Sequence, residues 1–96
     1  MAAAMFEWDD NKNNGNIAKH GISFPNAKRI WLGPVIEVPD MRFNYGEDRF
    51  VAFGEVGGEV LAVVDTWRRP ARRIISARRA NHGERRIYYQ AISGGP

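Results

Sequence analysis

The sequence predicts a single α+β domain in which two N-terminal helices precede a small antiparallel sheet and a C-terminal helix. Three observations support this fold class. The chain has 96 residues, the size of one domain with one hydrophobic core. Two apolar segments flank Gly57-Gly58, a two-residue connection typical of a β-hairpin. Residues that commonly cap helices stand near both ends of the chain, at Asp9 and Asn81.

The first helix is predicted to run from its N-cap Asp9 to His20. Gly21 follows at the position where a residue in the left-handed conformation commonly ends a helix. Residues 11–16 include five Asn or Gly, which lower the intrinsic helicity. Packing against the rest of the protein therefore has to hold this segment.

The second helix is predicted to be short. Ser23 or Phe24 is its N-cap, and Pro25 fits its first turn. Residues 27–31 place apolar side chains on one stripe, and Gly33-Pro34 ends the helix.

The middle of the chain predicts strands. A polar, charged loop over residues 40–48 follows the first of them. The two hairpin strands are apolar on both faces, which favours a central position covered by helices on at least one side. Residues 68–71 form a turn. The predicted strands are residues 35–39, 49–56, 59–67 and 72–77, of which the last three form a meander.

The last helix is predicted to begin after Asn81, because Glu84 three residues later completes a capping box. Apolar residues follow at helical spacing as far as Ala91. Tyr88 and Tyr89 cannot both face the core, so we expect one of them to be exposed.

Residues 1–96 are expected to form one domain with disordered ends at residues 1–4 and 93–96. No apolar run approaches the roughly 18 residues of a membrane span, and no export signal is visible. Cysteine is absent, which excludes disulfides and thiolate zinc sites. We therefore expect a cytoplasmic protein that does not contact membranes.

Positive charge is concentrated in the last third of the chain. Residues 1–65 hold six Lys or Arg and ten Asp or Glu, a net charge of −4. Residues 66–96 hold eight Arg and a single acid, Glu84, a net charge of +7. Arginine binds phosphate oxygens through two parallel N–H groups, so this segment indicates a phosphate-rich or acidic partner.

A candidate phosphate site lies where the last strand meets the last helix. Regular alternation would place Arg72 and Arg78 on one face of the strand and Arg73 and Arg79 on the other. The following helix presents free backbone N–H groups, which favour phosphate near Arg78. The alternative is a solvated basic surface. The low number of acidic residues in this segment argues against it.

Familiar nucleotide-binding, esterase and metal motifs are missing. The sequence has no GxxxxGK[ST] loop, GxGxxG turn or GxSxG elbow. His20 and His82 have no neighbouring ligands at metal-binding spacing. We expect neither a metal nor a cofactor, so any chemistry has to come from acid–base and cationic side chains.

Four separated blocks of the sequence occur in an order shared with a known family. They are residues 6–9 (FEWD), 19–24 (KHGISF), 46–50 (GEDRF) ahead of the Gly54 strand, and 73–78 (RIISAR) followed by 84–86 (ERR) with Tyr88. Together they resemble the BrnT toxins, over roughly residues 5–90. The resemblance implies a RelE-like ribonuclease fold and an endoribonuclease that acts on mRNA. It also implies a BrnA-like antitoxin that neutralises the toxin, with DNA bound only through their complex.

A metal-free ribonuclease must deprotonate a ribose 2′-hydroxyl, stabilise charge on the transition state and protonate the leaving 5′-oxygen. His20 is the leading acid–base candidate, since the dipole at a helix C-terminus favours its charged form. Arg78 is expected to bind the scissile phosphate. The acid–base candidates are His20, Glu47, Glu84 and Tyr88; the cationic candidates are Arg49, for the transition state, and Lys19, Arg73, Arg78 and Arg79, for RNA phosphates.

Several of these residues have a structural alternative. His20 could bond the last carbonyls of its helix. For Glu84 the capping-box role is favoured over that of a general base. Glu47 and Arg49 could form a loop ion pair of about 0–1 kcal/mol. Trp67 is the tryptophan best placed to stack on a nucleic-acid base.

Two other functions stay open. One is a catalytically silent basic module that binds an acidic protein or nucleic acid. The other, a DNA-binding repressor that acts alone, is less supported because no helix-turn-helix pattern is visible. If the chain is a toxin, the contact segment of its antitoxin is expected to be acidic or to cover the Arg-rich strand and helix.

Overall fold

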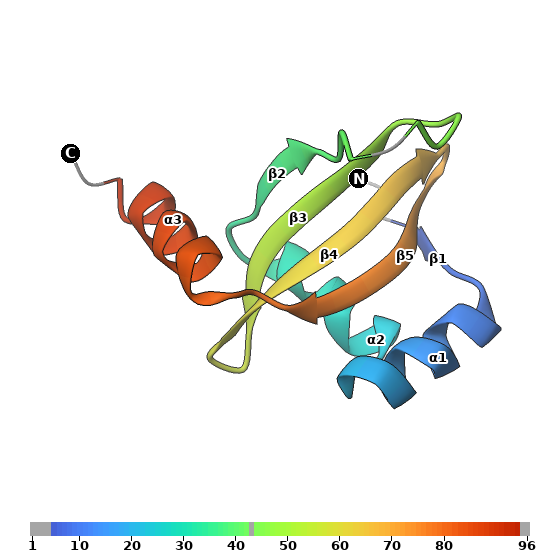
Figure 1. Ribbon diagram of the computed structural model, residues 1–96, viewed down its shortest axis with the longest axis horizontal. Helices are drawn as coiled ribbons and strands as arrows, with labels where there is room; N and C mark the ends of the chain where they lie inside the picture. The colour runs from blue at the N-terminus through green and yellow to red at the C-terminus, as the bar shows by residue number, and fades with distance from the viewer. Residues whose placement is uncertain (1–4, 43, 95–96) are drawn as a thin grey trace.

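The computed structural model describes residues 5–42 and 44–94 (Figure 1). Its order of elements confirms the predicted α+β class, with helices at both ends of the sheet region. The helices are α1 (Asp10–His20), α2 (Phe24–Ala27), the 3₁₀ helix η1 (Lys28–Leu32) and α3 (His82–Ile92). The strands are β1 (Met5–Glu7), β2 (Ile36–Pro39), β3 (Arg49–Val56), β4 (Glu59–Arg68) and β5 (Ala71–Arg79).

The strands form one mixed sheet in the order β1-β5-β4-β3-β2. Strands β2 to β5 pair antiparallel, which confirms the meander and its hairpin, where Gly57 and Gly58 have positive φ. β1 pairs parallel to β5, with Phe6 opposite Arg72. This strand was not predicted, because three residues are too few to show an alternating pattern.

The predicted helix ends are confirmed. Asp9 accepts a hydrogen bond from a backbone N–H of the first turn of α1, and Gly21 ends this helix at a φ of 70°. Ser23 caps α2, and Asn81 and Glu84 form the capping box of α3. The second helix is a single α-helical turn that continues as η1.

Asn16 explains how an Asn-rich segment is held as a helix. Its buried side chain donates to the carbonyl oxygens of Ile22 and Ala77, at 2.8 and 2.9 Å. It also accepts from the N–H of Ala77 at 3.1 Å. These bonds tie α1 to the backbone of β5, so tertiary contacts compensate for the low intrinsic helicity.

The helices cover the two faces of the sheet unequally (Figure 1). α1, α2 and η1 pack on one face, here called the covered face, where Phe24 and Ile30 are fully buried. Gly54 allows η1 to approach, since a Cβ at this position would lie 2.5 Å from the Cβ of Ile30. α3 packs at one end of the opposite face, with Tyr88 against Val60. We call the rest of that face the open face.

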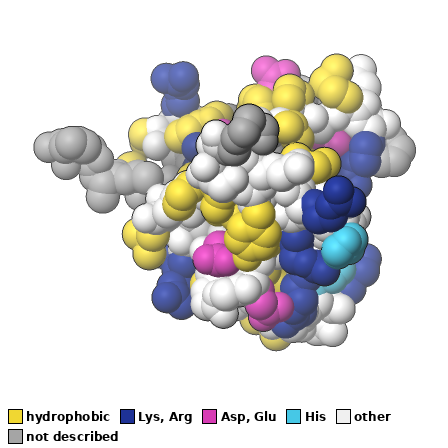
Figure 2. Space-filling view, turned by 90° about the vertical axis from the view of Figure 1, so that its left-hand side faces the viewer, with side chains coloured by type: hydrophobic (Ala, Val, Ile, Leu, Met, Phe, Trp, Pro, Cys, Tyr) yellow, Lys and Arg dark blue, Asp and Glu magenta, His cyan; other side chains and the backbone are white. Residues whose placement is uncertain are grey.

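α3 leaves much of its apolar surface exposed. Tyr88 is the one buried residue of this helix, whereas Ile87, Tyr89 and Ile92 are exposed, which confirms that only one of the two tyrosines faces the core. Seen from the side of α3 (Figure 2), hydrophobic side chains gather in the middle of the surface with Asp and Glu beside them, and most of the Lys, Arg and His side chains in view lie along one side.

A β-bulge interrupts the pairing of β4 with β5. The register pairs Val64 with Ser76 but Asp65 with Ile74, so Ile75 is an extra residue on β5. Beyond the bulge, the alternation of side chains along β5 is shifted by one position.

This shift changes the faces of the arginines. Partners directly opposite each other share a face, so the register places Arg72 and Arg79 on the covered face and Arg73 and Arg78 on the open face. The predicted grouping of Arg72 with Arg78 was therefore wrong. It assumed an alternation without a bulge, which short-range patterns do not reveal.

The two ends of the chain lie partly outside the description. We expected disorder at residues 1–4 and 93–96. Residues 1–4 and residues 95–96 lie outside the part of the chain that the structure describes. Ser93 and Gly94 form a turn after α3 and donate backbone hydrogen bonds to the carbonyls of Tyr89 and Ala91. Within residues 5–42 and 44–94, no helix has the length and apolar character needed to cross a membrane.

Candidate functional site

Four arginines of the meander, Arg49, Arg68, Arg73 and Arg78, share the open face. Arg49 on β3 lies opposite Thr66 on β4, and Thr66 lies opposite Arg73 on β5, so the three form a row across the sheet. Glu7 on β1 extends this row, because it lies opposite Arg73, whose Nη1 donates to its carboxylate at 2.8 Å. Arg78 stands on the same face, about 13 Å further along the strands.

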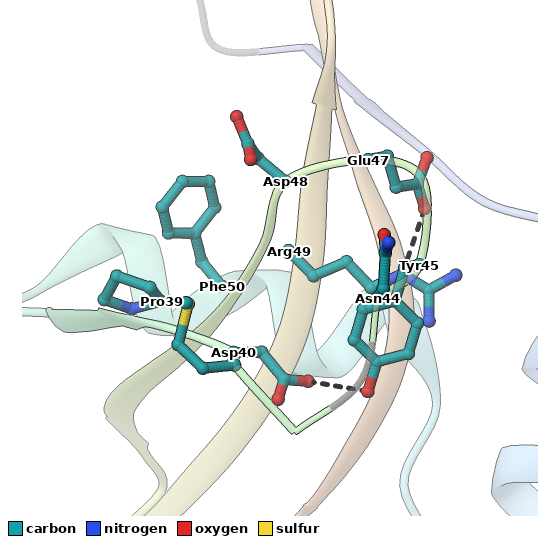
Figure 3. Close-up of a pocket in the computed structure, with 9 residues that line it drawn as sticks. Pro39, Asp40, Asn44, Tyr45, Glu47, Asp48, Arg49 and Phe50 are labelled. Carbon is teal, nitrogen blue, oxygen red and sulfur yellow. Dashed lines mark hydrogen bonds and ion pairs between the residues drawn. The ribbon is translucent and has the colours of Figure 1, made fainter.

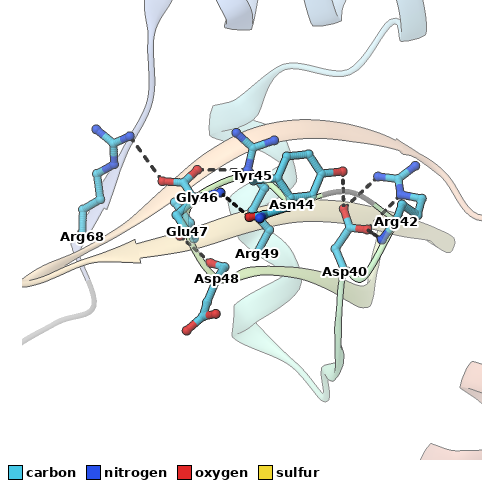
Figure 4. Close-up of polar contacts among 10 residues, drawn as sticks. Asp40, Arg42, Asn44, Tyr45, Gly46, Glu47, Asp48, Arg49 and Arg68 are labelled. Carbon is cyan, nitrogen blue, oxygen red and sulfur yellow. Dashed lines mark hydrogen bonds and ion pairs between the residues drawn. The ribbon is translucent and has the colours of Figure 1, made fainter.

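The loop before β3 brings Glu47 against Arg49. Nε of Arg49 donates to Oε2 of Glu47 at 3.0 Å, and Nη2 of Arg68 lies 3.5 Å from the other oxygen (Figure 4). The hydrogen bond from Arg49 is the main cause that lowers the pKa of Glu47, so this carboxylate is ionised at neutral pH. The hydroxyl of Thr66 donates to the carbonyl oxygen of Asp48 at 2.6 Å, which ties the loop to β4.

The same loop encloses a cleft of about 580 Å³ (Figure 3). The centre of the Tyr45 ring lies 4.0 Å from the guanidinium carbon of Arg49, and its hydroxyl donates to Asp40 at 3.3 Å. Two hydrogen bonds from Arg42, at 2.9 Å each, lower the pKa of Asp40 to about 2. The lining residues are Pro39, Asp40, Met41, Asn44, Tyr45, Glu47, Asp48, Arg49 and Phe50.

The guanidinium of Arg78 is bound by Glu84. Its Nη1 and Nη2 donate to the two carboxylate oxygens at 2.8 and 2.9 Å, while Glu84 also accepts from the N–H of Asn81. These hydrogen bonds raise the pKa of Arg78 and lower that of Glu84, and the charge of Arg42 acts against the rise at Arg78. Among the described residues no acceptor binds Nε of Arg78, so this N–H can still reach a phosphate.

Residues 8–84 match the family described as ribonuclease toxin, BrnT, of type II toxin–antitoxin system, which is well over half of the chain. The chain belongs to the BrnT family. The resemblance noted in the sequence is thereby confirmed, and membership implies ribonuclease activity, an RNA substrate and a cognate antitoxin. A comparison with curated proteins gave no match.

The structure separates the predicted BrnT site residues into groups. The bonded pair of Glu47 and Arg49 lies at one end of the open face with Arg73 two strands away, and the pair of Arg78 and Glu84 lies at the other end. Within residues 5–42 and 44–94, no three His, Cys, Asp or Glu side chains form a group that could hold a metal ion.

Three other predicted residues lie on the covered face or at its edge. Arg79 pairs with Glu59 at 2.7 Å and donates to the carbonyl oxygen of His20 at 2.8 Å. Its partner His20 and the preceding Lys19 end α1, which packs on the covered face. The backbone at His20 and Lys19 is thus on the other side of the sheet from the row of Arg49 and Arg73.

Tyr88 is a core residue in this structure. It is buried, its hydroxyl donates to the carbonyl oxygen of Pro34 at 2.8 Å, and burial raises its pKa. The BrnT match also ends before it. Its position favours an anchoring role for α3 over the predicted acid–base role.

Tyr45 and a cluster on the covered face were not predicted. In the cluster, Arg72 lies between the rings of Trp31 and Trp67, with centres 4.6 and 4.3 Å away, and it binds buried Asp65 at 2.7 Å and Glu37. Burial raises the pKa of Asp65 to about 6. The sequence did contain a signal for this cluster, because Asp65 is a single acidic residue within an otherwise apolar stretch of β4. One side of Trp67, the tryptophan that the sequence placed best for stacking on a base, thus faces Arg72, although the residue is 46% exposed.

Proposed function

We propose that this BrnT toxin is a metal-independent endoribonuclease that cleaves mRNA on the open face of its sheet and thereby inhibits translation. The row of Arg49, Thr66 and Arg73, with ionised Glu47 bound to Arg49, is the observation that carries the proposal. It puts the guanidinium of Arg49 beside a carboxylate and a cleft, with Arg73 two strands away on the same face, an arrangement suited to a phosphate that gains charge in the transition state.

In the proposed reaction, the 2′-hydroxyl of the RNA attacks the adjacent phosphorus and the 5′-oxygen of the next nucleotide leaves. Glu47 accepts the 2′-hydroxyl proton, while Arg49 and Arg73 stabilise the phosphorane-like charge. Arg78 binds a flanking phosphate rather than the scissile one, because it lies about 13 Å from the row and its fork is bound by Glu84.

Two groups are candidates for the proton donor to the leaving oxygen. Tyr45 lies in the cleft beside Arg49, and its hydroxyl is a proton donor in its hydrogen bond to Asp40. His20 stays the candidate from the sequence and would have to reach the substrate around the edge of β5. Cleavage by a Tyr45→Phe variant, measured against that of His20→Gln, distinguishes the two.

The experiment that tests the proposal is cleavage of a defined RNA by the purified protein in EDTA. We expect cleavage to continue at an unchanged rate, and the products to carry 2′,3′-cyclic or 3′-phosphate ends, because the substrate itself supplies the nucleophile. Activity that disappears in EDTA and returns with a divalent cation would refute metal independence. Products with 3′-hydroxyl ends would refute attack by the 2′-hydroxyl.

One observation favours the second function, a silent basic module. The arginines of the open face are paired with carboxylates: Arg49 and Arg68 with Glu47, Arg73 with Glu7 and Arg78 with Glu84. If expression of the wild-type chain arrests growth and folded Arg49→Ala does not, catalysis is supported. Harmless expression of the wild-type chain would support the silent module.

For the cognate antitoxin, we propose a BrnA-like protein that supplies the DNA contact of the complex. Membership of the BrnT family supports this proposal. Purified toxin should then bind operator DNA only when the antitoxin is present, which a gel-shift titration can measure.

A further inference from the structure

A groove of about 210 Å³ separates α3 from β2. On its two sides Val38 and Ile87 are 43% and 65% exposed. Tyr88 at its base is the sole buried residue of α3. The groove is lined by five apolar side chains and one carboxylate, namely Ile36, Val38, Phe53, Ile87, Tyr88 and Glu84.

The strand beside the groove is also open to pairing. β2 is the last strand in the sheet order, and among the described residues no further strand pairs with its outer edge. An extended peptide could therefore bond to the backbone of β2 while its side chains enter the groove.

Cations stand at one end of the groove. Glu84 lines it and holds Arg78, whose side chain is 41% exposed. The charge of Arg42 also acts on Arg78; the Arg42 guanidinium binds Asp40, and its side chain is 63% exposed. Over the side of the molecule that bears α3, Figure 2 shows hydrophobic side chains in the middle, with Asp and Glu beside them and Lys and Arg around them. The surface complements a segment that carries both apolar and acidic side chains.

Other occupants fit this chemistry less well. The exposed side chains Val38 and Ile87 offer neither a donor to a phosphate nor a ring for a base to stack on, and the Tyr88 ring of the groove is buried, which disfavours RNA. A second copy of the chain, related by two-fold symmetry, would bring together two copies of the same surface, and both would carry the positive charges of Arg42 and Arg78.

We propose that an apolar, acidic segment of the cognate antitoxin docks in the groove between α3 and β2, with its carboxylates at Arg42 and Arg78. This inference rests on the proposed function, because it assigns the neutralising contact of the toxin. A segment docked against Glu84 lies beside Arg78 and covers that end of the open face. The antitoxin thus excludes RNA without entering the cleft at Arg49.

The test places a charge in the groove and measures binding separately from cleavage. Val38→Asp and Ile87→Asp change exposed side chains that take no part in the proposed reaction. The control is Leu32→Asp on η1, also an exposed aliphatic residue, at 84%. Thermal melts establish that each variant is folded. Calorimetric titration with purified antitoxin then gives the affinity, and cleavage of RNA gives the activity.

We expect both groove variants to cleave RNA like the wild type and to bind the antitoxin at least about thirtyfold more weakly, as for the loss of a central interface contact. Leu32→Asp should bind normally. Antitoxin binding unchanged in both groove variants would overturn the proposal. A loss of cleavage in the folded variants would also overturn it, because it would assign the groove to RNA. The same holds if the variants disrupt a dimer of the toxin without any change in antitoxin binding. Because affinity is measured directly, an inactive wild-type protein would refute the proposed function and still leave the groove tested.

Discussion

Arg49 and Arg78 differ in what surrounds their guanidinium groups, so the same substitution should affect them differently. Arg49 belongs to the row and bonds Glu47 of the preceding loop, whereas Arg78 is bound by Glu84 and is partly exposed. Lysine keeps the charge but loses the planar fork. We expect Arg49→Lys to lower kcat by about ten- to a hundredfold, since a hydrogen bond to a charged group contributes roughly 1.5–3 kcal/mol. Arg78→Lys should mainly raise KM, by about three- to tenfold.

Steady-state cleavage of one RNA by both variants checks this expectation. Arg69→Lys, in the exposed turn between β4 and β5, is the control and should have only a small, salt-dependent effect. If Arg78→Lys lowers kcat as strongly as Arg49→Lys does, the scissile phosphate lies at Arg78, as the sequence alone predicted.

Glu84 allows its structural and catalytic roles to be separated. Glutamine serves in a capping box almost as well as glutamate, so Glu84→Gln should leave α3 folded. It removes the charge that competes for Arg78, and we expect RNA to bind about two- to fivefold more tightly at low salt, with cleavage retained. Fluorescence titration with RNA measures the affinity. A fall in cleavage of about a hundredfold or more would instead identify Glu84 as a general base.

At the scale of elements, the attachment of α1 to β5 depends on Asn16. Replacing it with Ala leaves the N–H and carbonyl of Ala77 and the carbonyl of Ile22 without this partner inside the core. We expect Asn16→Ala to lower the free energy of unfolding by roughly 2–4 kcal/mol, measured in urea. The control Asn14→Ala changes an exposed residue of the same helix and should be neutral or slightly stabilising. Equal effects of the two variants would show that Asn16 is not what holds α1.

At the scale of the whole molecule, Asp65 gives stability a dependence on pH. Its pKa is raised to about 6 in the folded protein, from 3.8, because it is buried; the charge of Arg72 opposes this rise and that of Glu37 adds to it. Between these values the folded state binds a proton that the unfolded state has lost. Stability from this group is therefore greatest at low pH and falls as the pH rises through about 6.

Between pH 5 and pH 7 we expect the free energy of unfolding of the wild type to fall by about 1 kcal/mol more than that of Asp65→Asn. The substitution removes the titrating group. Asp40, Glu47 and Glu84 have lowered pKa values, so their contributions are lost only at lower pH and do not mask the difference. Urea titrations of both proteins across this range measure it. Parallel pH profiles would mean that Asp65 stays ionised throughout.

The sequence by itself determined the features that depend on neighbouring residues. The sequence predicted the N-caps Asp9 and Asn81, the end of α1 at Gly21 and the hairpin at residues 57–58, and it gave Ser23 as one of two caps for α2. Capping bonds and positive φ involve only a few consecutive positions, which is why they could be predicted. The concentration of arginine and the blocks shared with the BrnT family can also be found from the sequence alone.

Only the tertiary structure decided which of these residues meet. The three-residue strand β1 exists through its pairing with β5, and one bulge at Ile75 moved Arg78 to the face that Arg49 and Arg73 share. Arg72 likewise meets Asp65 on the neighbouring strand β4. Register between strands depends on contacts that are distant in the sequence, and a shift of one residue exchanges the faces of every side chain beyond it.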